Sequence, residues 1–207
     1  MAFSDFVSEI VIAYNGFLSV LPPFFQTFFN FFFLALLIFL YAAFIWKFHN
    51  FVSHKNIFNL NLKQYNTAEH PLLERFNDIG LYLLEYIIIM PILIFFWFSI
   101  FGVSLIIFTD LQIDSVLVIS AVIVAAIRIT AYSNEEISKE VAKLLPLNLL
   151  AISLLVPGFF EVDRVLGNVS QIPGFFSVIL GYLLFIMVLE TILRLFDFIF
   201  SLLNIRD

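Results

Sequence analysis

Hydrophobic residues along this chain gather into five long segments, and polar residues gather between them. Four of the segments approach or exceed the length needed to cross the roughly 30 Å hydrocarbon core of a bilayer as a helix that rises about 1.5 Å per residue, and the fourth segment is short. We therefore predict an all-α, polytopic integral membrane bundle that forms a single domain over residues 1–207. The predicted transmembrane helices are residues 24–46, 80–108, 115–133, 144–160 and 174–200.

The segment before the first predicted span, residues 1–23, is also periodic. Apolar residues recur at helical spacing from Phe3 to Leu18, while polar residues such as Asp5 and Glu9 fall on the opposite face. The pattern predicts an amphipathic helix that lies in the outer membrane interface. The alternative is a helix that packs on the bundle, because amphipathicity fits both arrangements.

Residues 47–79 form the long connection between the first two predicted spans. Thr67 and Glu69, followed by Pro71, resemble a helix start with proline in the first turn. We therefore expect a cytoplasmic loop that contains a surface helix and leads into the second span.

Three prolines lie inside predicted spans: Pro91 in the second, and Pro146 and Pro157 in the fourth. A proline in a helix removes one backbone hydrogen bond and clashes with the preceding turn. We expect a kink at each of these positions, because transmembrane helices tolerate such breaks.

Basic residues are distributed unevenly among the six polar stretches that the spans define. Nine of the ten Lys and Arg residues fall in or beside the second, fourth and sixth stretches, and Arg164 alone falls in the fifth. Because basic residues that flank spans stay in the cytoplasm, this pattern predicts an N-terminus outside and a C-terminus inside. We expect a multi-pass protein of the cell (plasma) membrane, although an endoplasmic-reticulum protein would obey the same rule.

The composition narrows the classes of function. With 62% hydrophobic and 13% charged residues, the chain differs from soluble domains, which carry about 25% charge. The net charge of −6 argues against a nucleic-acid partner. Cysteine is absent, the three histidines lack carboxylate partners at metal-binding spacing, and no nucleophile or phosphate-loop motif occurs. We expect no metal and no cofactor, and an enzyme is the least expected class. We also expect no cleaved signal peptide, because no basic residue precedes the first span.

Arg128 is the most distinctive polar residue within a predicted span. About twelve apolar or small residues, some 18 Å of helix, separate it from the outer turn, so it should lie inside the membrane. A guanidinium there costs about 2.5–3.5 kcal/mol unless it is paired or reaches the interface. The sequence leaves three roles open: a side chain that snorkels to the headgroups, a structural ion pair, or a functional site.

The predicted orientation places further polar residues at a depth similar to that of Arg128. Glu190 and Arg194 share one helix face through their i,i+4 spacing. We predict an intramembrane polar layer built from Glu85, Arg128, Asn148, Glu190 and Arg194. The alternative is a ring of interfacial charges, each of which is solvated separately.

A charged stretch follows the third predicted span. It contains Glu135, Glu136 and Glu140, together with Lys139 and Lys143. Three neighbouring carboxylates could form a cytoplasmic acidic mouth that attracts cations. A solvated helical turn is the alternative, and the two lysines favour it.

Proline-broken spans and an intramembrane arginine recur at substrate and ion pathways. They favour an oligomeric channel or transporter for ions or small solutes. The alternative is a non-conducting scaffold or accessory subunit of a membrane complex, which needs only apolar helices, an orientation and a docking loop. The expected partners are the lipid bilayer and either further copies of this chain or other membrane proteins.

Overall fold

The computed structural model describes residues 2–55, 88–156, 159 and 161–202, and within them it contains helices and no strand. The predicted all-α fold class is therefore confirmed for this part of the chain. The predicted surface helix, Glu85 and Pro157 lie outside the described residues. The helices are α1 (Ala2–Ser19), α2 (Pro23–Val52), α4 (Met90–Phe108), α5 (Ile113–Ser133), α6 (Glu135–Leu154), α7 (Val162–Val169), α8 (Ile172–Val178) and α9 (Leu180–Leu202).

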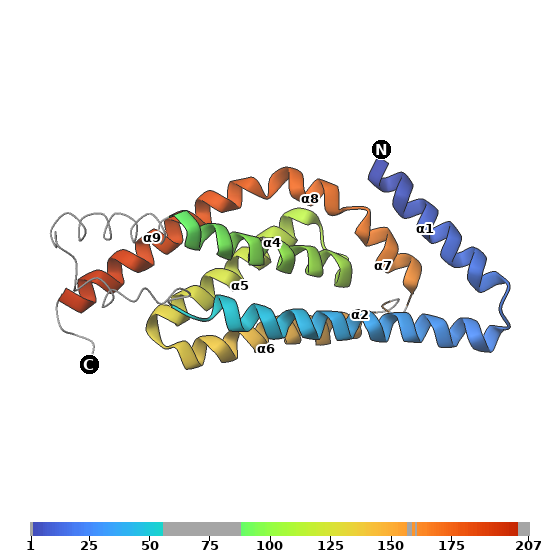
Figure 1. Cartoon of the computed structure of the whole chain (residues 1–207), viewed down its shortest axis with the longest axis horizontal. Coiled ribbons are helices and arrows are strands. Elements are labelled where there is room, and N and C mark those ends of the chain that lie inside the picture. The colour runs from blue at the N-terminus through green and yellow to red at the C-terminus, as the bar shows by residue number, and fades with distance from the viewer. Residues whose placement is uncertain (1, 56–87, 157–158, 160, 203–207) are drawn as a thin grey trace, which may run out of the picture.

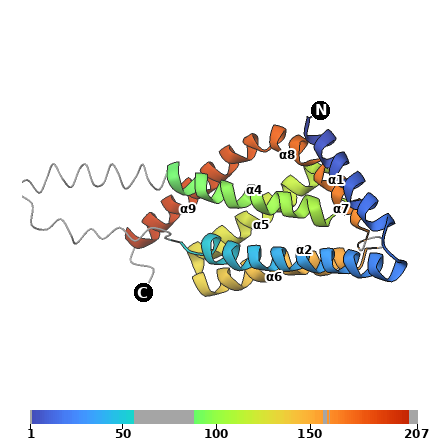
Figure 2. The same cartoon turned by 45° about the vertical axis from the view of Figure 1, so that its right-hand side comes forward.

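The long helices form an elongated bundle (Figure 1). Helix α6 packs against α5 and α2, while α4 packs against α5 and α9. Helices α8 and α9 arch over α4, and α1 turns back from the start of α2 to contact α7 (Figures 1 and 2). The C-terminal ends of α2, α5 and α9 therefore lie at one end of the bundle. The first turns of α4 and α6 lie at the same end.

Among the residues that the structure describes, three helices are long and apolar enough to cross a membrane: α2, α4 and α5. A fourth crossing is present if the segments Val162–Val178 and Leu180–Asp197, which meet at a bend of 60°, form one broken span. Helix α6 begins at Glu135 and carries Lys139, Glu140 and Lys143 along its first turns, so it does not meet the same criterion. The described residues therefore support three or four spans, and a crossing by the predicted segment 144–160, most of which lies in α6, stays a prediction.

Local sequence explains how several helices begin. Pro23 occupies the first turn of α2, where its missing N–H has no intrahelical partner to lose. Asn134 alone joins α5 to α6, and its side chain accepts hydrogen bonds from the backbone N–H groups of Glu136 and Ile137 at 2.9 and 3.2 Å. This capping satisfies two of the unpaired donors at the start of α6.

The prolines lie in different positions within the helices. Pro91 lies in the first turn of α4, directly after a π-helical turn at Ile88 and Ile89. Pro146 lies inside α6, which continues through it as one helix. The hydroxyl of Tyr41 donates to the Pro146 carbonyl at 3.1 Å and ties α2 to α6 at this position. Kinks at Pro91 and Pro146 stay predictions.

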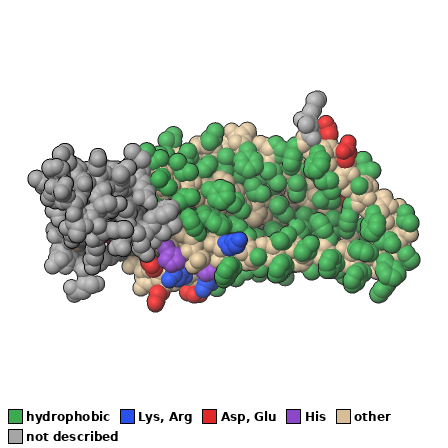
Figure 3. Space-filling model, viewed as in Figure 1, with side chains coloured by type: hydrophobic (Ala, Val, Ile, Leu, Met, Phe, Trp, Pro, Cys, Tyr) green, Lys and Arg blue, Asp and Glu red, His purple; other side chains and the backbone are tan. Residues whose placement is uncertain are grey.

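The core is built from aromatic and aliphatic side chains. The rings of Phe48 and Phe101 stack with centroids 5.3 Å apart, and Phe98 and Phe175 are completely buried nearby. Gly102 of α4 admits the Phe175 ring of α8 so closely that a Cβ atom at Gly102 would lie 2.5 Å from it. The surface is also largely hydrophobic (Figure 3), as expected for helices that face lipid.

Candidate functional site

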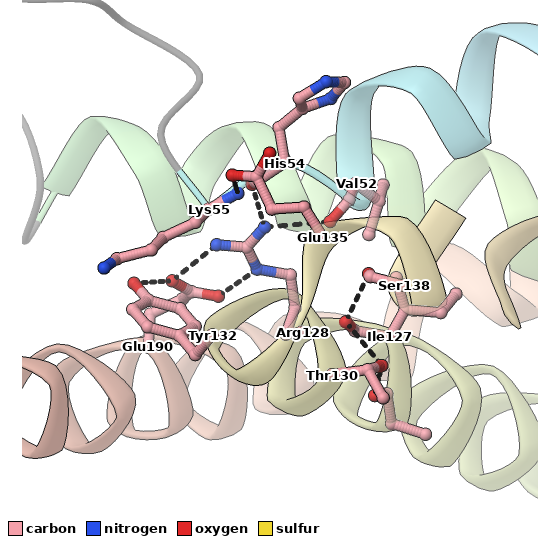
Figure 4. A network of polar contacts seen from close by, with 11 residues as sticks. Val52, His54, Lys55, Ile127, Arg128, Thr130, Tyr132, Glu135, Ser138 and Glu190 are labelled. Carbon is pink, nitrogen blue, oxygen red and sulfur yellow. Dashed lines mark hydrogen bonds and ion pairs between the residues drawn. The ribbon is translucent and has the colours of Figure 1, made fainter. Parts of the chain in front are cut away.

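Arg128 forms a buried ion pair between α5 and α9. Its side chain is 0% exposed, and that of its partner Glu190 is 4% exposed. The Nε and Nη2 atoms of Arg128 donate to the two carboxylate oxygens, with Nη2 3.1 Å from Oε2 (Figure 4). Such a two-point contact is among the strongest hydrogen-bonding arrangements in proteins. It also compensates each buried charge with its partner.

The remaining arm of the Arg128 guanidinium contacts the end of α2. Nη1 donates to the carbonyl oxygens of Val52 at 2.8 Å and His54 at 2.6 Å (Figure 4). The last carbonyl groups of a helix have no intrahelical partner, and the helix dipole makes this end negative. Arg128 therefore supplies both donors and positive charge to the C-terminal end of α2, and it connects three helices that are distant in sequence.

Tyr132 lies one turn after Arg128 on α5 and is also buried. Its hydroxyl donates to Oε2 of Glu190 at 3.1 Å. Three cationic groups surround its ring: the guanidinium carbons of Arg128 and Arg194 lie 5.5 and 5.8 Å from the centroid, and Nζ of Lys55 lies 6.0 Å away. These distances are within the range of cation–π attraction.

Lys55 adds a second ion pair to the same region. Its Nζ atom lies 2.6 Å from Oδ1 of Asp197 on α9, and its backbone N–H donates to the Glu135 carboxylate at 3.0 Å. We call Lys55, Arg128, Tyr132, Glu190, Arg194 and Asp197 the Arg128 cluster.

The structure brings together three residues of the predicted polar layer. Arg128 pairs with Glu190, and Arg194 joins them through the ring of Tyr132. Asn148 is exposed on α6 and does not face this group, and Glu85 lies outside the described residues. The burial of the Arg128 guanidinium fits the ion-pair interpretation rather than a side chain that snorkels to the surface.

The three carboxylates of the predicted acidic mouth lie in different surroundings. Glu135 accepts from the backbone of Lys55, and Glu140 pairs with Lys143 at 3.0 Å on the exposed face of α6. Glu136 is exposed at the first turn. This arrangement fits the solvated helical turn. Within the described ranges, no group of three or more His, Asp and Glu residues could hold a metal ion.

A second polar group lies at the opposite end of the bundle. Nη1 of Arg164 on α7 lies 2.7 Å from Oδ2 of Asp110, and Nδ2 of Asn168 donates to Oδ1 of Asp110 at 3.1 Å. Burial alone would raise the pKa of Asp110. The hydrogen bonds from Asn168 and Arg164 and the charge of Arg164 outweigh burial, so the pKa is lowered. We call Asp110, Arg164 and Asn168 the Arg164 cluster.

Polar contacts also hold α1 near this end. The hydroxyl of Tyr14 donates to Asn30 of α2 at 2.6 Å, and the amide of Asn15 donates to Asp163 of α7 at 3.1 Å. Burial, and then the negative charge of Asp163, raise the pKa of Tyr14. Helix α1 thus contacts the bundle, and its placement in a membrane interface stays a prediction.

The described basic residues divide between the two ends in the way that the sequence pattern anticipates. Arg164 lies at the end with α1 and α7, whereas the others lie near the end where α2, α5 and α9 terminate and α6 begins. The basic residues near that end are Lys47, Lys55, Arg128, Lys139, Lys143 and Arg194. Figure 3 shows that several basic side chains lie close together there.

The predicted polar layer omitted Lys55, Tyr132 and Asp197 of the Arg128 cluster, and it omitted the two backbone carbonyls that Arg128 contacts. Tyr132 carries a usable signal, because a tyrosine one turn after a buried arginine can reach the same partner. The carbonyls of Val52 and His54 carry none, since every residue has a carbonyl group.

Comparison with known proteins does not extend this description: no protein-family model, curated protein or solved structure matches the chain. The fold and the composition define a helical bundle with three or four helices suited to a membrane.

Proposed function

We propose that this chain is a multi-pass protein of the cell membrane that does not conduct by itself and acts as a scaffold or accessory subunit of a membrane complex. One observation carries this proposal. An apolar core, which includes Phe98, Phe101 and Phe175, fills the described interior between the Arg128 cluster and the Arg164 cluster. A conducting protomer needs a polar or wettable path, and tightly packed aromatic rings oppose one.

The Arg128 cluster suits a structural role in such a subunit. The buried charges of Arg128 and Glu190 compensate each other, and the contacts of Arg128 join α2, α5 and α9 at one end of the bundle. Buried ion pairs of this kind fix the relative positions of helices more than they add stability. A fixed end would present Lys55 and Glu135 to a partner in a constant arrangement.

Reconstitution of the purified protein into vesicles tests this function. We expect the flux of protons, K⁺, Na⁺ and small solutes to equal that of protein-free vesicles. We also expect chemical crosslinking in native membranes to join the chain to another membrane protein. Flux above the protein-free level, with no crosslinked partner, would overturn the scaffold proposal.

The proposed orientation has its own test, because the chain contains no cysteine. Single cysteines at Glu136 and Ser170, both exposed and at opposite ends of the bundle, can be labelled with a membrane-impermeant maleimide. We expect Ser170→Cys to react in intact cells and Glu136→Cys to react only after permeabilisation. The reverse pattern would contradict the orientation.

A transporter is the second candidate, and the break between α8 and α9 favours it. The two parts meet at a bend of 60°, and broken helices often surround substrate sites in transporters. Solute flux in the vesicle experiment, reduced by Tyr182→Ala beside this break, would favour the transporter over the scaffold.

A further inference from the structure

A polar pocket lies where α1 meets α2 and the start of α7. Its volume is about 230 Å³, and it belongs to the end of the bundle opposite the Arg128 cluster. We call it the α1 pocket. The described polar residues that line it are Tyr14, Asn15, Asn30, Glu161 and Asp163.

The hydrogen bonds within this lining use its donors and leave acceptors. The hydroxyl of Tyr14 donates to Asn30 at 2.6 Å, and the amide of Asn15 donates to Asp163 at 3.1 Å. A carboxylate and an amide oxygen each accept more than one hydrogen bond, so Asp163 and Asn15 keep acceptor capacity. Glu161 adds a second carboxylate, and no hydrogen bond or ion pair joins it to another described residue.

The charge of the lining points in the same direction. Two carboxylates line the α1 pocket, and no described Lys or Arg does. Arg164, which follows directly on α7, pairs with Asp110 instead. The group that best fits acceptors and negative charge is an ammonium, which has three N–H donors and no acceptor.

The size of the pocket favours an organic cation over a bare metal ion. A cavity of about 150 Å³ admits benzene, and drug-sized ligands occupy about 300–1,000 Å³, so this volume suits a small organic molecule. The buried side chains of Leu18 and Val162 form an apolar part of the lining. With two carboxylates, the described lining also falls short of a metal-binding group of three.

We propose that the α1 pocket binds a small organic cation, with a primary ammonium group at Glu161 and Asp163 and an apolar part against Leu18 and Val162. Such a ligand would contact α1, α2 and α7 together. It would therefore hold α1 on the bundle. The inference goes beyond the scaffold function and does not depend on it.

Hydrogen exchange of the α1 amides, Ala2–Ser19, in the purified full chain tests this site. The probes are 2-phenylethylamine and 2-phenylethanol, which have the same shape and differ in charge at pH 7. We expect 2-phenylethylamine to slow exchange in α1 in a saturable manner and 2-phenylethanol to have no such effect. The dose dependence gives an apparent Kd. Equal protection by the two compounds would overturn the proposal, because the ammonium group would then contribute nothing.

Charge variants locate the ammonium group. Glu161→Gln and Asp163→Asn should each raise the apparent Kd about threefold to fivefold, as expected for one exposed ion pair. Glu9→Gln changes an exposed carboxylate of α1 that does not line the pocket, so it is the matched control and should leave the Kd unchanged. A Kd that is unchanged in both pocket variants would contradict the assignment.

Asn15→Trp provides a variant that keeps both carboxylates. Asn15 is exposed, so the larger side chain can occupy the pocket without repacking the core, and protection by 2-phenylethylamine should be lost. Full protection in Asn15→Trp would overturn the proposal. Displacement of 2-phenylethylamine by millimolar Ca²⁺ would also overturn it, because the site would then bind a metal ion. None of these results depends on flux or crosslinking, so the scaffold proposal can fail or survive separately.

Discussion

The two ends of the bundle use the same chemistry in different surroundings. In each, an arginine pairs with a carboxylate from a distant segment, and a third polar side chain bonds to that carboxylate. The side chains of Arg128 and Glu190 are 0% and 4% exposed, whereas those of Arg164 and Asp110 are 14% and 49% exposed. Breaking a buried pair leaves an uncompensated charge, while water replaces a lost partner at the exposed end. Burial therefore decides what each pair contributes.

Replacement of Arg128 should have the largest effect. Arg128→Met leaves the Glu190 carboxylate buried without its partner and should lower the free energy of unfolding by about 3–5 kcal/mol. Unfolding in mixed micelles by titration with a denaturing detergent measures this loss. The double variant Arg128→Met with Glu190→Leu should recover much of the stability. A double variant that is no more stable than the single one would contradict the ion-pair interpretation.

A substitution in the apolar core between the two ends should give the next largest loss of stability. Gly102→Ala places a Cβ atom against the Phe175 ring, which is packed on all sides, and should cost about 1–3 kcal/mol. Gly181→Ala is the control, because nothing lies within 4 Å of its added Cβ. Phe175→Leu should partly rescue Gly102→Ala in the same unfolding measurement. Equal effects of the two glycine substitutions would show that the contact with Phe175 is not tight.

A pair of tyrosine substitutions compares the two ends directly. Tyr132→Phe removes the hydroxyl that donates to buried Glu190 and should cost about 1 kcal/mol. Tyr14→Phe removes the part-buried bond to Asn30 and should cost less, because water can reach that end. Thermal unfolding of both variants in one detergent makes the comparison. A larger loss of stability for Tyr14→Phe than for Tyr132→Phe would contradict the view that the buried hydrogen bond contributes more.

Acidification should have the smallest effect of these changes. Loss of the exposed Asp110–Arg164 pair should lower the free energy of unfolding by under about 1 kcal/mol. The pKa of Asp110 is lowered from 3.8, so its pairing stabilises the fold above that value. The stabilisation is lost as the pH falls through the lower pKa of the folded state. Asp110→Asn should remove this part of the acid sensitivity in unfolding measured from about pH 6 down to about pH 2, a range that includes the region below 3.8, and Asp114→Asn is the control. Identical pH profiles for wild type and Asp110→Asn would contradict the role of Asp110.

The sequence predicted the spans best where a long apolar run has polar ends. Helix α5, Ile113–Ser133, lies within two residues of the predicted segment 115–133, whereas α2, Pro23–Val52, begins near the predicted residue 24 and continues six residues past the predicted end at 46. The break at Ile179 was missed, because no proline occurs between Ser177 and Tyr182 to indicate it. Helices α8 and α9 both pack on α4 on either side of this bend, and a local sequence pattern does not encode such packing.

The position of each residue along its predicted span identified part of the Arg128 cluster. It did not show which residues face one another across neighbouring helices. Arg128, Glu190 and Arg194 lie close together in the structure, whereas Asn148 lies on the exposed side of α6. The common depth of these residues in a bilayer stays a prediction. Spacing along the sequence gives depth, whereas the rotation of a helix about its axis depends on what it packs against.

The one-residue connection at Asn134 has a consequence for biosynthesis. Helix α6 is too charged in its first turns to qualify as a span, yet it packs along α5, and Ser138 donates to the Ile127 carbonyl at 2.9 Å across the turn. We expect the insertion machinery to accept α5 and α6 only as a helical hairpin. A glycosylation reporter placed after α6 should show insertion of the hairpin and rejection of α6 alone. The order of synthesis would then matter, because α5 must emerge before its weaker neighbour can enter the bilayer.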